Sequence, residues 1–178
     1  RSLYGLAEGQ VIESGGTPLL LSEHYRSHPA IIEFSNRTFY QGRLILRTPL
    51  PRPQEKIPGQ AMGVFWIDTP GAVARSPRSA LDQAEVSGIT DLIAKWVAGG
   101  LFERKDFTLG VVTPFRLQME KVREAIADQS WPEAITERIT VGTAHRFQGD
   151  ECDVMIFSPV VAQGMSERLV RWVATTDQ

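Results

Sequence analysis

Short apolar runs of strand length alternate with amphipathic helical patterns in this chain, and the alternation limits the fold more than any other feature. The runs cover residues 108–113, 139–141 and 154–157, and the helical patterns cover 82–98 and 114–127. Parallel strands need crossover connections, usually helices, which cover the faces of the sheet. The sequence therefore predicts an α/β fold with a mostly parallel sheet and helices on both faces.

The first repeat of this pattern begins with the apolar run 64–68, which is expected to form a buried strand. Residues 71–80, rich in Arg, Ser and Pro, are expected to form a loop. Asp82 can cap the following helix, with Glu85 three positions on, and Gly99-Gly100 can end it. One face of this helix is apolar, and its members are Val86, Ile89, Ile93, Trp96 and Val97.

The second repeat places a helix after the strand that ends near Val112. Pro114 is expected to open this helix, and its apolar side consists of Phe115, Met119, Val122 and Ile126. Earlier in the chain, residues 29–40 have a helical pattern, and residues 48–58 contain four prolines and are expected to be irregular. Ligands of open parallel sheets bind at the carboxyl ends of the strands, so the loops after Val112 and Val141 are the ones expected to carry function.

The composition of the chain narrows the class of protein only slightly. The 178 residues fit one domain, and the net charge of -2 gives no general basic surface of the kind that non-specific nucleic-acid binders carry. The stretch 37–56 carries a local excess of positive charge, and the favoured interpretation is a solvated loop and its rims. The single Cys152 excludes an internal disulfide and fits a reducing cytoplasm. No apolar run approaches the ~20 residues that span a bilayer, so no membrane partner is expected.

Three segments carry the chemical signal. The first is Glu23–Pro29 (EHYRSHP), followed by FYQGRL at 39–44. The second is Val112–Phe115 (VTPF) with Gln118, and the third is Val141–Glu151 (VGTAHRFQGDE). In this order they resemble the second RecA-like motor domain of superfamily 1 helicases, in the branch that contains the nonsense-mediated-decay helicase and its bacterial relatives.

The resemblance covers roughly residues 19–160. It implies one RecA-like domain over 1–178, in which 1–60 is an N-terminal segment with the YRSHP motif and 61–178 is the α/β core. The chain opens at Arg1 and closes at Gln178 directly after an apolar-rich stretch, which favours a piece of a longer protein. The partners implied are single-stranded DNA or RNA and the first RecA-like domain of the same parent chain.

The resemblance gives Tyr25 and Arg26 the role of the family's aromatic-arginine pair. The ring of Tyr25 is expected to stack on adenine. Arg26 is expected to reach the γ-phosphate of ATP as an arginine finger, the one catalytic residue, because a guanidinium stays charged and binds phosphate oxygens with two parallel hydrogen bonds. The alternative is that Tyr25 is a core aromatic and Arg26 a surface ion-pair partner.

In the third segment the resemblance implies two tasks for one loop. Thr143 and Gln148 are candidates for contact with the nucleic-acid backbone or for relaying between the two sites. Glu151 is expected to accept a hydrogen bond from the ribose hydroxyl. Gly149 belongs to the nucleotide site because a glycine lets the backbone approach a ligand closely. Thr143 also reads as an ordinary β-branched strand residue. His145 is given no role.

The second segment places Thr113, Pro114 and Gln118 at the end of a strand and in the next helix. The resemblance implies that they hold a phosphate of a single strand without reading its sequence. Helix capping is an alternative role for Thr113. Both roles can hold at once.

Metal ligands are not predicted. The run Asp150–Asp153 has the composition of an acidic magnesium box, but such a box follows an apolar strand, and this run precedes one. His24 and His28 are four residues apart, but Pro29 follows and no third ligand is evident. A metal-dependent hydrolase that uses these two histidines and Asp150 is the weakest of the alternatives.

The sequence contains no G-x-x-x-x-G-K-[ST] phosphate loop. ATP and its Mg²⁺ are therefore expected to be held mainly by the first motor domain, and the chain alone is not expected to hydrolyse ATP. The family's last motif, with a second arginine, is expected just beyond Gln178. The prediction is an ATP-dependent helicase motor domain, and the alternative is a degenerate helicase domain that only binds nucleic acid or protein.

Overall fold

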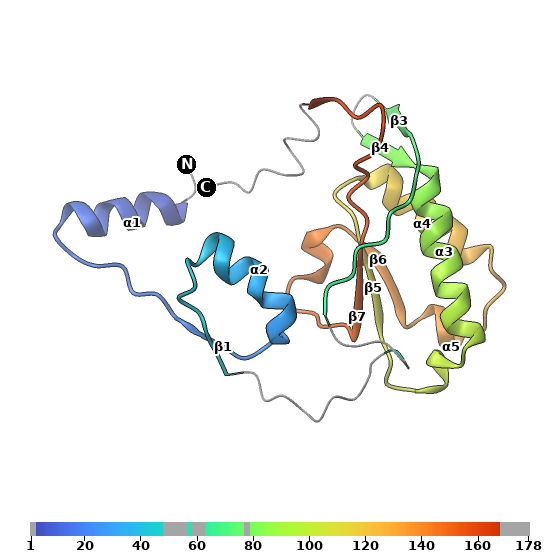
Figure 1. Cartoon of the computed structure of the whole chain (residues 1–178), viewed down its shortest axis with the longest axis horizontal. Helices are drawn as coiled ribbons and strands as arrows, with labels where there is room; N and C mark the ends of the chain where they lie inside the picture. Colours follow the sequence, from blue (N-terminus) through green and yellow to red (C-terminus); the bar gives the residue numbers. More distant parts are fainter. Residues whose placement is uncertain (1–2, 48–56, 58–62, 77–78, 168–178) are drawn as a thin grey trace. The chain divides into compact units, whose positions relative to one another are not determined.

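The structure is a computed structural model of the whole chain, and it describes residues 3–47, 57, 63–76 and 79–167 (Figure 1). The chain divides into two compact units. The first unit comprises residues 1–55 and 61–65, and the second comprises 56–60 and 66–178. The single domain over 1–178 stays a prediction.

The first unit consists of two helices and a pair of short parallel strands. Its second helix starts with Pro29 at the first helical position, and Nδ1 of His28 accepts a hydrogen bond from the N–H of Ala30 at 3.2 Å. The helix predicted over 29–40 is thereby confirmed, although it ends one residue earlier. The elements are α1 (Leu3–Glu13), β1 (Glu23–His24), α2 (Pro29–Phe39) and β2 (Ile45–Leu46).

The second unit is built on a parallel sheet. Its strands are β5 (Leu109–Val112), β6 (Ile139–Gly142) and β7 (Val154–Phe157), in the order β6-β5-β7. Both neighbours run parallel to β5, and Gly110 is in register with Thr140 on one side and Met155 on the other. All three strands were predicted from their apolar runs, and all three are confirmed.

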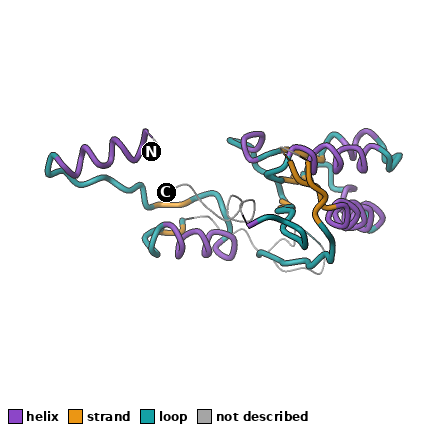
Figure 2. The backbone as a smooth tube through the Cα atoms, turned by 90° about the horizontal axis from the view of Figure 1, so that it is seen from above, coloured by secondary structure: helices purple, strands orange, loops and turns teal. Residues whose placement is uncertain are grey.

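Helices lie against both faces of this sheet. On one face, the sheet lies beside α3 and α4 (Figure 1 and Figure 2). Leu109 and Val111 of β5 are buried in one apolar cluster with residues of these two helices. On the other face, a Cβ added to Gly110 would meet the ring of Phe147 in η2 at 3.0 Å. The α/β, RecA-like fold class with a mostly parallel sheet is thus confirmed. The helices are α3 (Gln83–Ala98), η1 (Leu101–Glu103), α4 (Arg116–Ala127), α5 (Glu133–Thr136) and η2 (Ala144–Phe147).

The predicted caps of α3 are present. Oδ1 of Asp82 accepts hydrogen bonds from the N–H groups of Ala84 at 2.8 Å and Glu85 at 3.3 Å. The helix ends at Gly99, and Gly100 takes the left-handed conformation with φ of 75°.

The second predicted helix begins later than expected. Helix α4 starts at Arg116 rather than at Pro114, because Phe115 has extended backbone angles and stands at the cap. The ring of Phe115 is therefore not part of the helix face. It is buried in a second small cluster with Ala80 and Val160.

The loop predicted over residues 71–80 is wrong. Strands β3 (Val73–Ser76) and β4 (Ser79–Asp82) form an antiparallel pair within it. The side chains of Ala80 and Asp82, on one face of β4, are buried.

The strand predicted over residues 64–68 is also wrong. These residues form no strand, and the side chains of Phe65 and Trp66 are 54% and 83% exposed. An apolar run becomes a buried strand only where a neighbouring strand supplies hydrogen-bonding partners, and none of the described strands pairs with this one. The division between the two units also falls inside the run.

The irregular segment predicted over residues 48–58 lies almost wholly outside the described residues. Within the parts of the chain that the structure describes, no helix has the length and apolar character needed to cross a membrane.

Candidate functional site

The carboxyl ends of the three parallel strands meet at one edge of the sheet and are joined by hydrogen bonds. The N–H of Thr113, directly after β5, donates to the carbonyl of Gly142 at 3.1 Å. The N–H of Ser158, directly after β7, donates to the carbonyl of Val112 at 2.9 Å. Backbone bonds therefore hold together the three loops that leave this edge.

Thr113 and Pro114 form the turn between β5 and α4. The side chain of Thr113 is fully buried, and its hydroxyl accepts a long hydrogen bond from the N–H of Phe115 at 3.4 Å. This bond closes the turn that precedes the helix. It does not cap α4, because Phe115 is itself the N-cap residue and has no side-chain cap hydrogen bond, so the helix-capping role considered for Thr113 is wrong. Pro114 is half-buried. The structure places both residues at the edge, and contact between Thr113 and nucleic acid stays a prediction.

Gln118 is fully buried and ties three segments together. Its Oε1 accepts from the N–H of Asp82 at 2.9 Å, and its Nε2 donates to the Asp82 carbonyl at 3.3 Å and to Oγ of Ser158 at 3.0 Å. All its hydrogen bonds in this network are to the protein. Its role in this conformation is to position the loops that leave β5 and β7. Because its side chain is buried, direct contact with single-stranded nucleic acid is not supported.

From the sequence, Glu85 is expected only to take part in capping α3, but the structure gives it a further role. Its carboxylate accepts hydrogen bonds from the hydroxyl of Ser158 and from the N–H of Val160 at 3.1 Å. Burial raises the pKa of Glu85, the two hydrogen bonds lower it, and the nearby charge of Asp82 raises it. No spacing rule reveals this residue, because its partners lie more than 70 positions along the chain.

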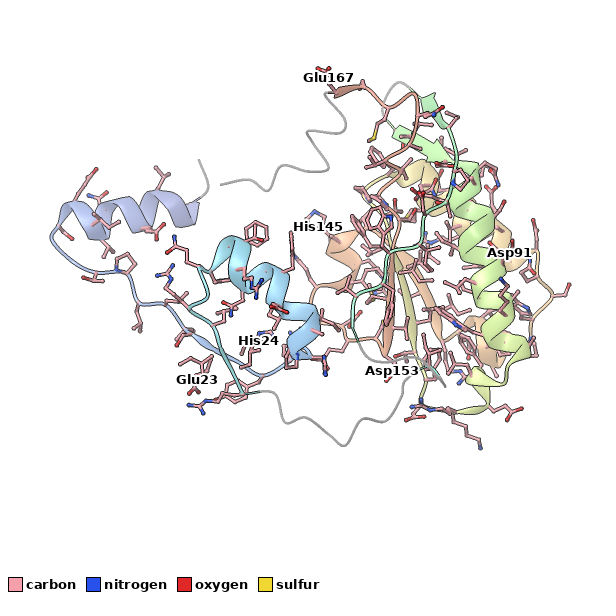
Figure 3. The ribbon with its side chains drawn as sticks, in the orientation of Figure 1. Glu23, His24, Asp91, His145, Asp153 and Glu167 are labelled. Atoms are coloured by element: carbon pink, nitrogen blue, oxygen red, sulfur yellow. The ribbon has the colours of Figure 1, made fainter. Side chains whose placement is uncertain are left out.

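Strand β6 ends with a glycine that its surroundings require. A Cβ at Gly142 would lie 2.7 Å from Cβ of Arg146. Thr143 follows as the half-buried first residue of the η2 turn, and its carbonyl accepts from the N–H of Arg146 at 2.9 Å. Gln148, at the end of η2, and His145 are exposed, and Figure 3 shows His145 on this turn. Gln148 is therefore the exposed member of the predicted nucleic-acid set, Thr143 and Pro114 are half-buried, and Thr113 and Gln118 are buried.

The same loop runs back to the other end of the sheet before β7 begins. Glu151 lines a pocket of about 220 Å³ there, together with Thr108 and Arg138, which precede β5 and β6. Gly149 has φ of 91°, a conformation that favours glycine. The structure thus separates the residue predicted for ribose from Thr143, which was predicted for nucleic acid. The pocket is lined by Thr108, Glu137, Arg138, Thr140, Phe147, Asp150, Glu151 and Cys152.

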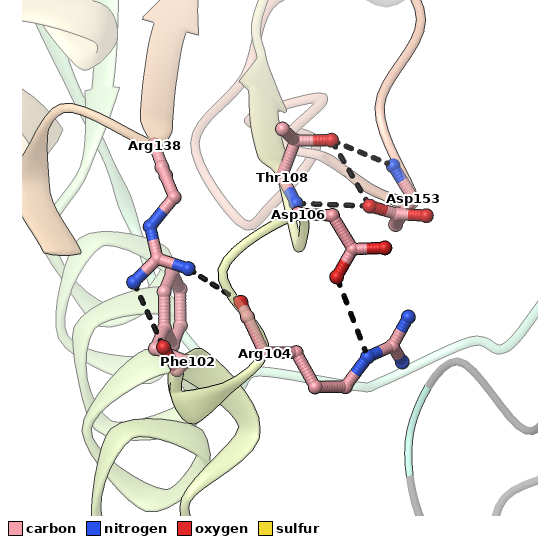
Figure 4. Close-up of polar contacts among 6 residues, drawn as sticks. All are labelled: Phe102, Arg104, Asp106, Thr108, Arg138 and Asp153. Carbon is pink, nitrogen blue, oxygen red and sulfur yellow. Dashed lines mark hydrogen bonds and ion pairs between the residues drawn. The ribbon is translucent and has the colours of Figure 1, made fainter. Parts of the chain in front are cut away.

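The acidic run next to this pocket includes a structural residue (Figure 4). Oδ2 of Asp153 accepts from the N–H of Thr108 at 2.9 Å and from its hydroxyl at 3.2 Å, and the N–H of Asp153 donates to Oγ1 of Thr108 at 3.1 Å. Arg138 donates to the carbonyls of Arg104 and Phe102 at 2.6 and 2.8 Å. Asp153 and Arg138 hold the start of the sheet together.

The Tyr25-Arg26 pair lies in the first unit, directly after β1. The ring of Tyr25 is 56% exposed, which excludes the alternative of a core aromatic. Its hydroxyl donates to the carboxylate of Glu23, and this bond and one from Arg47 lower the pKa of Glu23. Arg26 is exposed. Both residues of the pair are thus exposed in the turn that follows β1.

The two histidines of this motif act as hydrogen-bond acceptors. Nε2 of His24 accepts from the N–H of Ser27 at 2.9 Å, and His28 caps α2. Figure 3 shows the position of His24 beside Glu23. Among the described residues, no cluster of histidine, cysteine and acidic side chains has the arrangement of a metal site. These contacts give both histidines a structural role in the turn.

Comparison with known proteins adds to this geometry. A family model described as "AAA domain" matches residues 8–170. The chain belongs to this AAA-domain family. The match includes all three motif segments and nearly the whole of both units.

Three relatives of the chain are described as helicases or as regulators of nonsense transcripts. Putative helicase mov-10-B.2 of Danio rerio is 29% identical over 150 residues, which cover 77% of this chain and 15% of the relative. Helicase SEN1 of Saccharomyces cerevisiae is 29% identical over 162 residues, 85% of this chain and 7% of the relative. A regulator of nonsense transcripts 1 homolog of Drosophila melanogaster is 26% identical over 165 residues, which cover 85% of this chain and 13% of the relative.

These matches confirm the resemblance to superfamily 1 helicases of the nonsense-mediated-decay branch. They also show that the chain spans at most 15% of the length of these relatives. The chain is thus a helicase-family domain.

Proposed function

We propose that the chain is the second motor domain of a longer ATP-dependent helicase that moves along single-stranded DNA or RNA in the cytoplasm. The observation that supports this most directly is the exposed Tyr25-Arg26 pair, presented after β1 in a member of the helicase family. The first motor domain of the same protein holds most of the ATP and its Mg²⁺. ATP bound between the two domains favours the closed state of the motor.

In this proposal Arg26 supplies the arginine finger. Its charge stabilises the developing charge on the transferred phosphoryl group when the two motor domains close on ATP. Tyr25 stacks on adenine through its exposed ring. Glu151 contacts the ribose from the pocket beside Thr108. Gly149, two residues earlier in the same loop, contributes its backbone to the nucleotide site.

Nucleic acid binds at the carboxyl edge of the sheet. Thr143 and Gln148 make the contacts to the sugar-phosphate backbone, since Gln148 is exposed and Thr143 stands half-buried at the start of the same loop. The same edge is supported by Thr113, Pro114 and Gln118, which lie between the end of β5 and the first turn of α4. Direct contact of these residues with nucleic acid requires the loop after β5 to open. Contacts of this kind fix the strand without reading its sequence.

The test is the ATPase activity of the full-length protein in the presence of a single-stranded oligonucleotide. Arg26→Ala is expected to lower kcat by ~10³-fold, because the charge at the transferred phosphoryl group is lost. Arg26→Lys is not expected to restore it, since an ammonium lacks the planar two-pronged geometry. Affinity for the oligonucleotide without ATP should stay within about twofold of wild type.

Arg37→Ala is the matched control, because Arg37 is also exposed in the first unit, lies outside the motif segments and pairs with Glu33 on the surface of α2 at 2.7 Å. It should leave kcat unchanged. An Arg26→Ala protein with wild-type stimulated ATPase activity contradicts the proposal. Wild-type protein that binds the oligonucleotide but never hydrolyses ATP favours a degenerate domain that serves as a binding module.

A further inference from the structure

The turn that follows β7 contains a buried valine in an unfavourable backbone conformation. Val160 has φ of 59°, in the left-handed region, and its side chain is fully buried. A β-branched residue rarely adopts this conformation, because its side chain crowds the backbone. The conformation persists only where neighbouring groups hold it, and such strain is common at functional sites.

Glu85 is the group that holds the backbone of this turn. Its carboxylate accepts the N–H of Val160 at 3.1 Å and the hydroxyl of Ser158. Glu85 stands in the first turn of α3, and its own N–H is held by the Asp82 cap. The side chain of Val160 packs in the cluster of Ala80 and Phe115. One carboxylate thus fixes two successive donors of the turn to the start of a long helix.

The attachment extends to the loop after β5 through Gln118. The hydroxyl of Ser158 stands between the two side chains, since it donates to Glu85 and accepts from Nε2 of Gln118 at 3.0 Å. Gln118 lies in the first turn of α4. The loops that leave β5 and β7 are therefore connected by a hydrogen bond between two buried side chains, those of Gln118 and Ser158.

We propose that Glu85 is a positioning residue that latches the strained Ser158–Val160 turn to α3, so that the loops leaving β5 and β7 move together when nucleic acid binds. This inference rests on the proposed function for its consequence, since these loops lie at the edge to which nucleic acid is assigned. The latch itself rests only on Glu85, Ser158, Val160 and Gln118.

The latch is tested by amide hydrogen exchange in the full-length protein. Glu85→Ala should speed exchange of the Val160 amide on the order of tenfold, because its acceptor is lost. Glu85→Gln keeps one carbonyl oxygen as an acceptor and should give an intermediate rate. Glu120→Ala removes a glutamate that pairs with Arg116 on the surface of α4, and it should leave this amide unchanged. An unchanged Val160 amide in Glu85→Ala overturns the latch.

The coupling is tested by nucleic-acid stimulation of ATPase activity in the same protein. Glu85→Ala should lower kcat at saturating oligonucleotide roughly three- to tenfold and leave the oligonucleotide concentration at half-stimulation unchanged. Glu85→Gln should partly rescue kcat. If Glu85→Ala does not fold, Ser158→Ala breaks the link to Gln118 and should reproduce the loss of kcat.

The possible failures are distinguishable. A faster Val160 amide with unchanged stimulation overturns the coupling and leaves the proposed function intact. A wild-type protein whose ATPase activity never responds to nucleic acid overturns the proposed function, whereas the exchange measurement still decides the latch.

Discussion

Each of the two units of the chain is stabilised internally by a different kind of interaction. In the second unit a continuous apolar core joins α3, α4 and the sheet, and residues such as Phe107 and Ile93 are fully buried. In the first unit none of the described side chains is buried, and Leu3, Leu19 and Leu21 are each more than 80% exposed.

The first unit is instead ordered by hydrogen bonds within short segments. His24 and His28 accept backbone N–H groups nearby, and the amide of Asn36 both donates to and accepts from the backbone of Leu44. Such bonds define the shape of a turn, but each contributes little net free energy compared with the burial of apolar side chains. The comparison teaches that the motif turn has defined geometry without a core of its own.

The largest expected contrast comes from one aromatic truncation in each unit. Phe107→Ala removes a fully buried ring that packs edge-on against Phe102, and it should lower the free energy of unfolding by ~3–5 kcal/mol. Phe34→Ala removes a ring that is 68% exposed against Phe39, and should cost less than ~1 kcal/mol. Urea unfolding measures both. Equal costs would show that the first unit buries Phe34 after all.

A pair of glycine substitutions should change stability in opposite directions. Gly142→Ala places a Cβ 2.7 Å from Cβ of Arg146 and should destabilise the protein by ~1–3 kcal/mol. Gly9→Ala, inside α1, has no atom within 4 Å of the new Cβ. It should stabilise α1 by ~0.5–1 kcal/mol through helix propensity. Thermal unfolding followed by circular dichroism gives both signs, and a stabilising Gly142→Ala contradicts the packing of η2 against the sheet.

Two glutamates should respond to pH in opposite directions. Burial raises the pKa of Glu85, so its contribution favours folding below the ordinary glutamate pKa and is lost as the pH rises through the raised value. The hydrogen bond from Tyr25 lowers the pKa of Glu23, so its contribution is present above the ordinary value and is lost as the pH falls through the lowered one. Side-chain NMR titration measures both midpoints, and Glu85→Gln and Glu23→Gln identify the signals.

The smallest effect on stability is expected from the exposed helical ion pairs, of which each unit has an example. Arg37 pairs with Glu33 in α2, and Arg116 pairs with Glu120 in α4, both on exposed helix surfaces. Either arginine changed to alanine should alter the free energy of unfolding by no more than ~0.5 kcal/mol. Urea unfolding at low and high salt checks this. A larger loss at Arg37 would mean that the basic stretch 37–56 contributes more than a solvated surface.

The elements that could be predicted from sequence are those whose determinants are local. The cap at Asp82 and the stop at Gly99-Gly100 are signals within one helix, and both are present. The apolar run 64–68 failed as a prediction because a strand depends on a partner strand, which the run itself does not specify. Helix α1 was not predicted, and its apolar residues have no buried face that would have given a pattern.

The candidate site shows the same division. The sequence order of motifs indicated the edge where Thr113 and Thr143 lie, since strand ends follow from the fold. It could not indicate that Gln118 is buried, because its partners Asp82 and Ser158 are 36 and 40 positions away. Glu85 was missed as a member of the site for the same reason. Tyr25 and Arg26 were found because their motif is contiguous.

One contact at the margin of the sheet bears on how the protein behaves at high concentration. Strand β6 pairs only with β5 among the described strands, so its outer carbonyls are open to a strand from another molecule. The guanidinium of Arg123 donates to the outer carbonyl of Val141 from Nε at 3.1 Å and from Nη2 at 2.6 Å. A positive charge on α4 occupies the acceptor that an incoming strand needs, and this disfavours edge-to-edge aggregation.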